Sequence, residues 1–288
     1  MSIINFITNP SRASFSRVFG GAPAKPGETF GVPGYGSSTV ISIVTSVTLL
    51  FIWWLVTTMG WVKPFFLPSP QSIAIRTIEL ASTEYSGATL WQHTEWSLYR
   101  VFTAFFIAVG LAIPIGIGMG VNRVLRGIFD PPIEFYRPIP PLGYLPLTII
   151  WLGIDDLQKI VLIALAIFAP MALAARAGVR SVSIEQIHAA YSLGANRFQI
   201  LRYIVLNGAM PEILTGMRIG IGFGWTTLVA AEMVAAQEGL GHMVLTAAEF
   251  LDTEVVILGI VMIGVIAYVF DLLMRFIQHK LVPWKGKM

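Results

Sequence analysis

The stretch VFTAFFIAVGLAIPIGIGMGVN, residues 101–122, contains no charged side chain, and Arg123 and Arg126 follow it directly. A helix rises about 1.5 Å per residue, so a segment of this length crosses the roughly 30 Å hydrocarbon core of a bilayer. Inside a bilayer every backbone N–H and C=O needs a partner, and a helix supplies those partners within its own segment. The stretch therefore predicts a transmembrane helix that ends at a basic segment.

The composition of the whole chain agrees with a membrane protein. Of its 288 residues, 55% are apolar and 12% are charged, whereas a soluble domain carries about 25% charged residues. The chain has no cysteine, which excludes disulfides, thiolate metal sites and cysteine nucleophiles. No basic cluster is interleaved with aromatic residues on a polar face, so nucleic acid is not an expected partner. We predict an all-α integral membrane protein.

Apolar segments on both sides of residues 101–122 predict five further spans. They cover residues 38–60, 139–154, 160–175, 213–236 and 255–270, and prolines interrupt the short one at 139–154. Residues 1–37 are polar and rich in Ser, Gly and Pro, and residues 281–288 are basic, so both are expected to be tails. The chain is thus predicted to have six transmembrane helices within residues 38–280, surrounded by membrane lipid.

The distribution of Lys and Arg predicts the orientation of these spans. Six spans place both termini on one side of the membrane, together with the loop after residue 122 and the polar segment 176–211. Most Lys and Arg residues fall on that side, and cytoplasmic segments carry the excess of basic residues. Both termini and segment 176–211 are therefore expected to be cytoplasmic.

The cytoplasmic segment 183–206 has a helical pattern on both sides of Gly194. Apolar residues recur at helical spacing at Ile184, Ile187 and Tyr191, and again at Phe198, Leu201 and Ile204. Two short amphipathic helices joined at a glycine are the expected structure. On this pattern alone, a surface helix lying in the lipid interface is the alternative.

The same segment resembles a signature of the membrane subunits of bacterial ABC importers. That signature has the form E-A-A-x(3)-G-x(9)-I-x-L-P, and Ala189-Ala190, Gly194 and Ile204-Val205-Leu206 fit it. His188 stands where the glutamate is usual, and Asn207 stands where the proline is usual. The resemblance implies an ATPase-coupling loop that includes His188, Ala189, Ala190, Gly194, Ala195, Arg197, Ile204 and Leu206.

Other motifs are similar to the permeases for taurine, sulfonates, nitrate and bicarbonate. They are Phe66-Leu67-Pro68-Ser69-Pro70, Tyr136-Arg137-Pro138-Ile139-Pro140-Pro141-Leu142 and Gly216-Met217-Arg218-Ile219-Gly220. Within that family the likeness is strongest to the taurine permeases, through residues 88–93, 166–170, 194–197 and 239–251. The resemblance implies a type I importer permease fold in the bacterial inner membrane and import of taurine or another alkanesulfonate. Nitrate or bicarbonate is the alternative solute.

The resemblance also implies the partners of this chain. Two copies pair as a homodimer, two cytoplasmic ATP-binding subunits bind beneath, and a periplasmic solute-binding protein delivers the solute.

Residues 116–120 and 220–224 are glycine-rich, but neither matches G-x-G-x-x-G and no G-x-x-x-x-G-K-[ST] occurs. Small residues four apart suit helix packing in lipid. We expect no cofactor on this chain and ATP with Mg²⁺ on the partner ATPase subunits.

Charged residues in or near the predicted spans are candidates for the solute pathway or a gate, since a charge at the bilayer centre costs about 3 kcal/mol. Glu134 and Arg137 lie three residues apart and can neutralise each other, either as an interfacial pair or in the pathway. Arg218 can snorkel to the cytoplasm or face the pathway. Glu232 lies about 21 Å beyond Arg218 along the helix, too far to pair with it, so it faces the pathway or is a buried carboxylate bonded to partners of the Trp or Thr type from another helix. Trp225 of the same span is a further candidate for the pathway or a gate.

Two other classes of protein fit the sequence less well. An intramembrane enzyme needs a nucleophile with a base, or paired aspartates, inside its spans, and no two histidines or aspartates fall there together. The four histidines show no metal-ligand spacing. A passive channel has no need of the loop 183–206. We therefore predict a transport subunit with no catalytic residue and no metal site.

Overall fold

The structure, a computed structural model, describes residues 39–283. The predicted tail 1–37 and residues 284–288 of the predicted C-terminal tail lie outside the described residues. The chain divides into two units, Met1–Gln71 and Ser72–Met288. All the elements of both units that the structure describes are helices, apart from an isolated bridge between Tyr85 and Ala88.

The first unit contains α3 (Thr39–Thr58), which corresponds to the predicted span 38–60. Its sequence is apolar and free of charge, and it is long enough to cross a bilayer. The indole Nε1 of Trp53 donates a hydrogen bond to the carbonyl oxygen of Pro68 at 3.1 Å. This bond fixes the proline-rich turn after α3 against the helix. The next helix, α4 (Pro70–Ser82), begins at the end of this unit.

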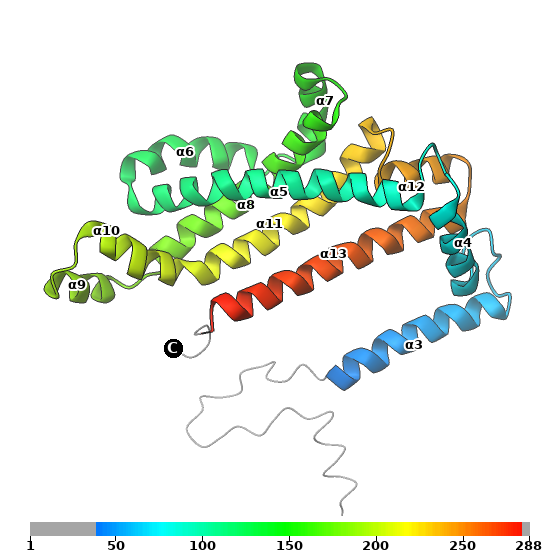
Figure 1. Cartoon of the computed structure of the whole chain (residues 1–288), viewed down its shortest axis with the longest axis horizontal. Coiled ribbons are helices and arrows are strands. Elements are labelled where there is room, and N and C mark those ends of the chain that lie inside the picture. Colours follow the sequence, from blue (N-terminus) through cyan, green and yellow to red (C-terminus); the bar gives the residue numbers. More distant parts are fainter. Residues whose placement is uncertain (1–38, 284–288) are drawn as a thin grey trace, which may run out of the picture. The chain divides into compact units, whose positions relative to one another are not determined.

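The second unit is a bundle built around three long helices. These are α5 (Leu90–Val121), α8 (Asp156–Arg180) and α11 (Leu206–Ala235). The helix α8 packs extensively on both α5 and α11, which meet each other over a shorter stretch (Figure 1). Around them lie α6 (Arg123–Tyr136), α7 (Pro141–Leu152), α9 (Ile184–Ser192), α10 (Arg197–Ile200), α12 (Leu240–Glu249) and α13 (Thr253–Leu281). The main core lies where the three long helices meet.

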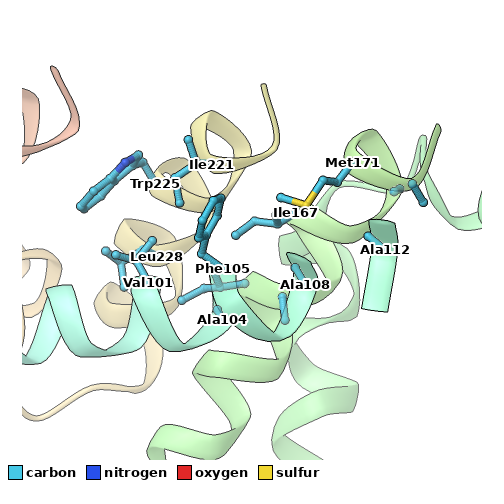
Figure 2. Packing of buried hydrophobic residues seen from close by; sticks show 14 of the residues in the cluster. Val101, Ala104, Phe105, Ala108, Ala112, Ile167, Met171, Ile221, Trp225 and Leu228 are labelled. Carbon is cyan, nitrogen blue, oxygen red and sulfur yellow. The ribbon is translucent and has the colours of Figure 1, made fainter. Parts of the chain in front are cut away.

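Small residues allow these three helices to approach closely. Figure 2 shows alanines of α5 facing Ile167 and Met171 of α8 and the apolar side chains of α11. A Cβ atom on Gly116 of α5 would overlap the carbonyl oxygen of Ala172 in α8. A Cβ atom on Gly224 of α11 would lie 2.7 Å from Cδ1 of Ile167. The predicted role of the two glycine-rich stretches in helix packing is confirmed at these positions.

The prediction of membrane-spanning helices is confirmed for five of the six spans. In the part of the chain that the structure describes, five helices are long and apolar enough to cross a membrane. The third predicted span is α7, an apolar helix of 12 residues. At 1.5 Å per residue it is about 18 Å long, which is less than the hydrocarbon thickness. It ends at Gly153, whose φ of 78° takes the chain out of the helix.

A glycine-to-alanine pair on α5 tests this packing. Gly116→Ala should lower the stability of the detergent-solubilised protein by about 2 kcal/mol, because the new methyl group forces α5 away from the backbone of α8. Gly110→Ala is the control, since nothing lies within 4 Å of a Cβ atom there. Thermal unfolding of both variants provides the measurement, and equal midpoints would contradict the packing described here.

Candidate functional site

The segment 183–206 forms a projecting foot at one end of the bundle, which we define as α9, the turn at Gly194 and α10 (Figure 1). The Ser183 hydroxyl caps α9 by accepting a hydrogen bond from the backbone N–H of Gln186. Gly194 has a φ of 83°, a left-handed conformation that favours glycine. Asn196 then caps α10 in a reciprocal pair with Gln199, with distances of 2.8 and 2.9 Å. The first short helix and the glycine turn are therefore confirmed.

The prediction of a second, separate short helix is wrong. After α10 the chain passes through one π-helical turn (Leu201–Val205) and continues without interruption into α11. Residues 197–210 contain no proline, and the Asn207 side chain donates to the carbonyl oxygen of Tyr203 at 2.9 Å. The helix can continue because every residue keeps its backbone N–H. Residues 197–235 thus form one continuous helical segment.

The foot has one face on the bundle and one face free in the described structure. Ile187 and Ala190 of α9 and Ile204 pack with Val205 and Ala209 in a small core beneath it. The residues exposed at its tip are Ile184, Tyr191, Leu193 and Phe198, and Leu193 is 89% exposed. Of the predicted coupling residues, His188, Ala189, Gly194 and Arg197 are exposed, and Ala190, Ala195, Ile204 and Leu206 are partly buried. An apolar tip on a polar foot is typical of a surface that binds another protein.

A cavity of about 610 Å³ opens near the middle of the second unit. Its wall includes Tyr136, Arg137, Pro140, Tyr144, Phe223 and Thr226, which come from the α6–α7 junction and α11. Residues 165–173 of α8 complete the wall. The motif Tyr136–Leu142 that the sequence singled out therefore lines a cavity. Among the predicted pathway residues, Arg137 is the one that borders it.

The structure pairs Glu134 with Arg137, as their spacing predicts, but loosely. The closest oxygen and nitrogen of the two side chains are 3.8 Å apart, and both side chains are about half exposed. Arg176 of α8 lies 3.8 Å from Glu134 and forms a closer ion pair with Asp130. Glu134 is therefore shared between two arginines.

Arg218, which the sequence places either at the cytoplasmic boundary or in the pathway, is paired with an acidic residue of a neighbouring helix. Its guanidinium forms an ion pair with Asp271 of α13, and Asp271 also accepts a hydrogen bond from Arg275 at 2.8 Å. Trp225 lies in the main core among apolar side chains and is 6% exposed (Figure 2). These positions keep Arg218 neutralised and hold Trp225 away from the wall of the 610 Å³ cavity.

Glu232 lies at the end of α11 opposite the foot and is fully buried. Its carboxylate accepts hydrogen bonds from Arg100 Nη1 at 2.8 Å, from Ser97 Oγ at 2.8 and 2.9 Å, and from the Gly241 N–H at 2.9 Å. A Cβ atom on Gly239 would lie 2.5 Å from the carboxyl carbon, so the turn before α12 needs glycine to wrap around it. Glu232 is thus a buried carboxylate whose partners come from other segments, although not from the residue types expected.

Several members of this buried cluster were missed by the sequence analysis. Arg100 also donates to Asp156 at 2.8 Å, and Lys159 lies 3.7 Å from Asp156, so two cations balance two carboxylates. Arg100 and Lys159 lie just outside the predicted spans 101–122 and 160–175, yet each is 3% exposed. The sequence did contain a signal for this cluster, which is Glu232 within the predicted span 213–236. A carboxylate at the end of a span requires a nearby cation.

His93 joins this end of the bundle to the turn before α12. The Gly239 N–H donates to its Nδ1 at 3.0 Å, and its Nε2 lies 2.8 Å from the carbonyl oxygen of Tyr85, to which it donates. One ring nitrogen accepts and the other donates, which is the neutral form of the side chain. On α12, desolvation by burial lowers the pKa of His242, whose ring is 3.1 Å from the Ser86 hydroxyl. His93 therefore links the turn before α12 to the backbone at Tyr85 through both of its ring nitrogens.

Five long apolar helices within residues 39–283, together with the bundle of the second unit and its projecting foot, define a multi-pass membrane component. The chain belongs to the family described as "Binding-protein-dependent transport system inner membrane component", whose model matches residues 109–283. It is therefore an inner-membrane transport component rather than an enzyme. Transport of this kind depends on a solute-binding protein and on ATP-binding partners.

Individual relatives agree with this assignment. The chain is 52% identical to the "Taurine transport system permease protein TauC" of Escherichia coli over 248 residues, which cover 86% of this chain and 90% of that protein. It is 32% identical to the "Putative aliphatic sulfonates transport permease protein SsuC" of Bacillus subtilis, over 85% of this chain and 87% of that protein. The fold is that of a chain in the inward-facing MetNI methionine ABC transporter, with a TM-score of 0.53, 18% identity, and coverage of 67% and 95%.

A charge-removing substitution tests the buried cluster. Glu232→Gln leaves Arg100 and Lys159 with one carboxylate between them, so the protein should lose about 3 kcal/mol of stability. Thermal unfolding of the detergent-solubilised protein should show a lower midpoint. The control is Glu249→Gln on α12, because the Glu249 side chain is exposed. If the two variants unfold at the same temperature, the cluster does not hold this end of the bundle together.

Proposed function

We propose that the chain is the permease subunit of an ATP-driven importer that carries taurine or another alkanesulfonate into the cytoplasm. The main support is the 52% identity to a taurine permease over nearly the full length of both chains. A second relative is a putative permease for aliphatic sulfonates, so two relatives share the sulfonate group as the solute's common feature.

The foot is the proposed docking site for the ATP-binding subunits. Its tip exposes Ile184, Leu193 and Phe198, which can enter an apolar groove on a partner. His188, Ala189, Gly194 and Arg197 lie on the same exposed surface. Ala190, Ala195, Ile204 and Leu206 are partly buried, so we assign them the role of holding the foot on the bundle. His188 replaces the usual glutamate, and the contact at this position is thus neutral or positive rather than negative.

The proposed assembly contains two copies of this chain and two ATP-binding subunits, with a solute-binding protein at the opposite end. Both termini and the foot lie in the cytoplasm in this proposal, since basic residues concentrate in those segments. ATP and Mg²⁺ bind to the partner subunits, and this chain carries no cofactor. Membrane lipid surrounds the exposed apolar faces of the long helices.

The continuous helical segment 197–235 gives this proposal a mechanical basis. It begins in the foot, and residues Phe223 and Thr226 on it line the 610 Å³ cavity. The distance along the helix from Arg197 to Thr226 is about 45 Å at 1.5 Å per residue. A movement of the foot, driven by closure of the ATP-binding subunits, would therefore tilt one wall of the cavity directly.

Uptake measurements test the proposed solute. Cells that express this chain with its ATP-binding and solute-binding partners should accumulate radiolabelled taurine, and short alkanesulfonates should compete because they share the sulfonate group. Nitrate and bicarbonate are the comparison solutes. Uptake of nitrate or bicarbonate with no uptake of taurine or alkanesulfonates would reject the sulfonate assignment and leave the membership of the family intact.

Gly194 provides a test of coupling. Gly194→Ala forces a side chain into a left-handed conformation, at a cost of about 1–2 kcal/mol, although nothing lies within 4 Å of the added Cβ atom. The turn should shift, and solute-stimulated ATP hydrolysis by the assembled importer should fall several-fold. Gly127→Ala on α6 is the matched control, because its surroundings are equally open and its backbone is helical. Unchanged stimulation in Gly194→Ala would show that the turn does not position the foot.

A further inference from the structure

Among the arginines in or beside the long helices of the second unit, Arg100, Arg218 and Arg137 have different surroundings. Arg100 is buried and bound to two carboxylates, and Arg218 is bound to Asp271. Arg137 has one carboxylate nearby, at 3.8 Å, and its side chain is 55% exposed. A charge-assisted hydrogen bond is about 2.7–2.9 Å long, so the Arg137–Glu134 pair is too long to use the guanidinium donors. Arg137 retains donors for another oxyanion.

The cavity beside Arg137 has the chemistry of an anion site. Among the residues that line it in the described part of the chain, Arg137 is the only one with a charge. The rest of the wall is proline, aliphatic and aromatic, apart from the hydroxyls of Tyr136, Tyr144 and Thr226. The Thr226 hydroxyl donates to the Phe223 carbonyl at 2.9 Å, and the Tyr136 hydroxyl donates to the Leu165 carbonyl at 3.4 Å. A low-dielectric wall strengthens the attraction between a cation and a bound anion. A volume of about 610 Å³ lies within the range of small-molecule sites.

A smaller cavity of the bundle that is lined by cations does not offer such a site. It has a volume of about 280 Å³ and is lined by Arg100, Lys159 and Asp156. Its cations are already bound, because Arg100 donates to Asp156 and Glu232, and Lys159 donates to the Ile154 carbonyl at 2.9 Å. An entering anion would compete with carboxylates that are fixed in place. The 610 Å³ cavity is therefore the better position for a sulfonate.

We propose that Arg137 binds the sulfonate of the solute within the 610 Å³ cavity during translocation. This inference rests on the proposed function. The planar guanidinium can donate two parallel hydrogen bonds to a sulfonate, which the ammonium of a lysine cannot reproduce. The rings of Tyr144 and Phe223 line the same cavity and can hold the alkyl chain, and an aromatic ring also attracts the ammonium of a zwitterion. The half-exposed position of Arg137 keeps the site weak enough to release the solute.

Cysteine labelling tests whether Arg137 makes the electrostatic potential of the cavity positive, and it needs no transport measurement. The chain has no cysteine, so Thr226→Cys places a single thiol on the cavity wall of this subunit. The probes are two methanethiosulfonates, one with an anionic sulfonatoethyl group and one with a cationic trimethylammonioethyl group. In the assembled importer the anionic reagent should react faster, and adding Arg137→Gln should lower the anionic-to-cationic rate ratio about tenfold.

Two further variants make the labelling result specific. Ser82→Cys at the exposed end of α4 is the control, and its rate ratio should not respond to Arg137→Gln. Glu134→Gln removes the neighbouring carboxylate, so in the Thr226→Cys background it should keep the ratio at least as high as in the parent. If Arg137→Gln leaves the anionic-to-cationic rate ratio at Thr226→Cys unchanged, the inference is overturned.

Transport measurements then test binding itself. Arg137→Lys and Arg137→Gln should both reduce taurine uptake about tenfold, while ATP hydrolysis stimulated by the loaded binding protein stays within about twofold, because the foot is unchanged. Arg123→Gln, at the exposed start of α6, is the control for loss of a positive charge. Wild-type uptake by Arg137→Lys would overturn the paired-donor role. Failure of the wild-type importer to move any sulfonate would reject the proposed function, whereas the labelling ratio reports on Arg137 independently.

Discussion

The close approach of α5, α8 and α11 is the constraint on which the rest of the structure depends. In lipid the helices gain nothing from leaving water, so direct packing must hold them together. Gly116 brings α5 onto the backbone of α8. Gly224 of α11 leaves room for the side chain of Ile167 from α8. Because these three helices are fixed, their ends bring Arg100, Asp156 and Glu232 together from distant parts of the chain. The buried cluster is thus a consequence of the glycine packing.

The charges of the bundle follow from the same arrangement. A charge in a low-dielectric environment persists only when it is paired and hydrogen-bonded. The packed end of the bundle provides this for Glu232, which accepts hydrogen bonds from two side chains and one backbone N–H. Arg137 differs because the prolines after α6 end that helix beside the cavity, where neighbouring side chains do not surround it. The strength of pairing therefore separates charges that stabilise the fold from a charge that is available to a solute.

Local signals predicted the elements, and long-range packing decided the rest. The length and apolar character of residues 101–122 predicted a span because both properties lie within the segment, and Gly194 predicted a turn for the same reason. The continuation of the second foot helix was not predicted, although the absence of proline from residues 197–210 permits it, and Val205 and Ala209 of the continued helix pack in the core beneath the foot. Partners such as Arg100 and Glu232 are 132 residues apart. No local pattern specifies such a pair. In the same way, the motif around Arg137 was identified in the sequence, but the cavity that it lines was not predicted.

Continuity between α10 and α11 changes what the foot can do. A foot made of two separate helices would need a hinge before the bundle, and part of any displacement would be lost there. The π-helical turn at residues 201–205 keeps the backbone hydrogen-bonded, so the link to α11 is a local distortion and not a break. Since α11 packs along most of its length on α8, a tilt of the foot in the proposed importer would move the α11 wall of the cavity together with its α8 wall. The packing that fixes the fold would then also carry a force from the foot to the solute.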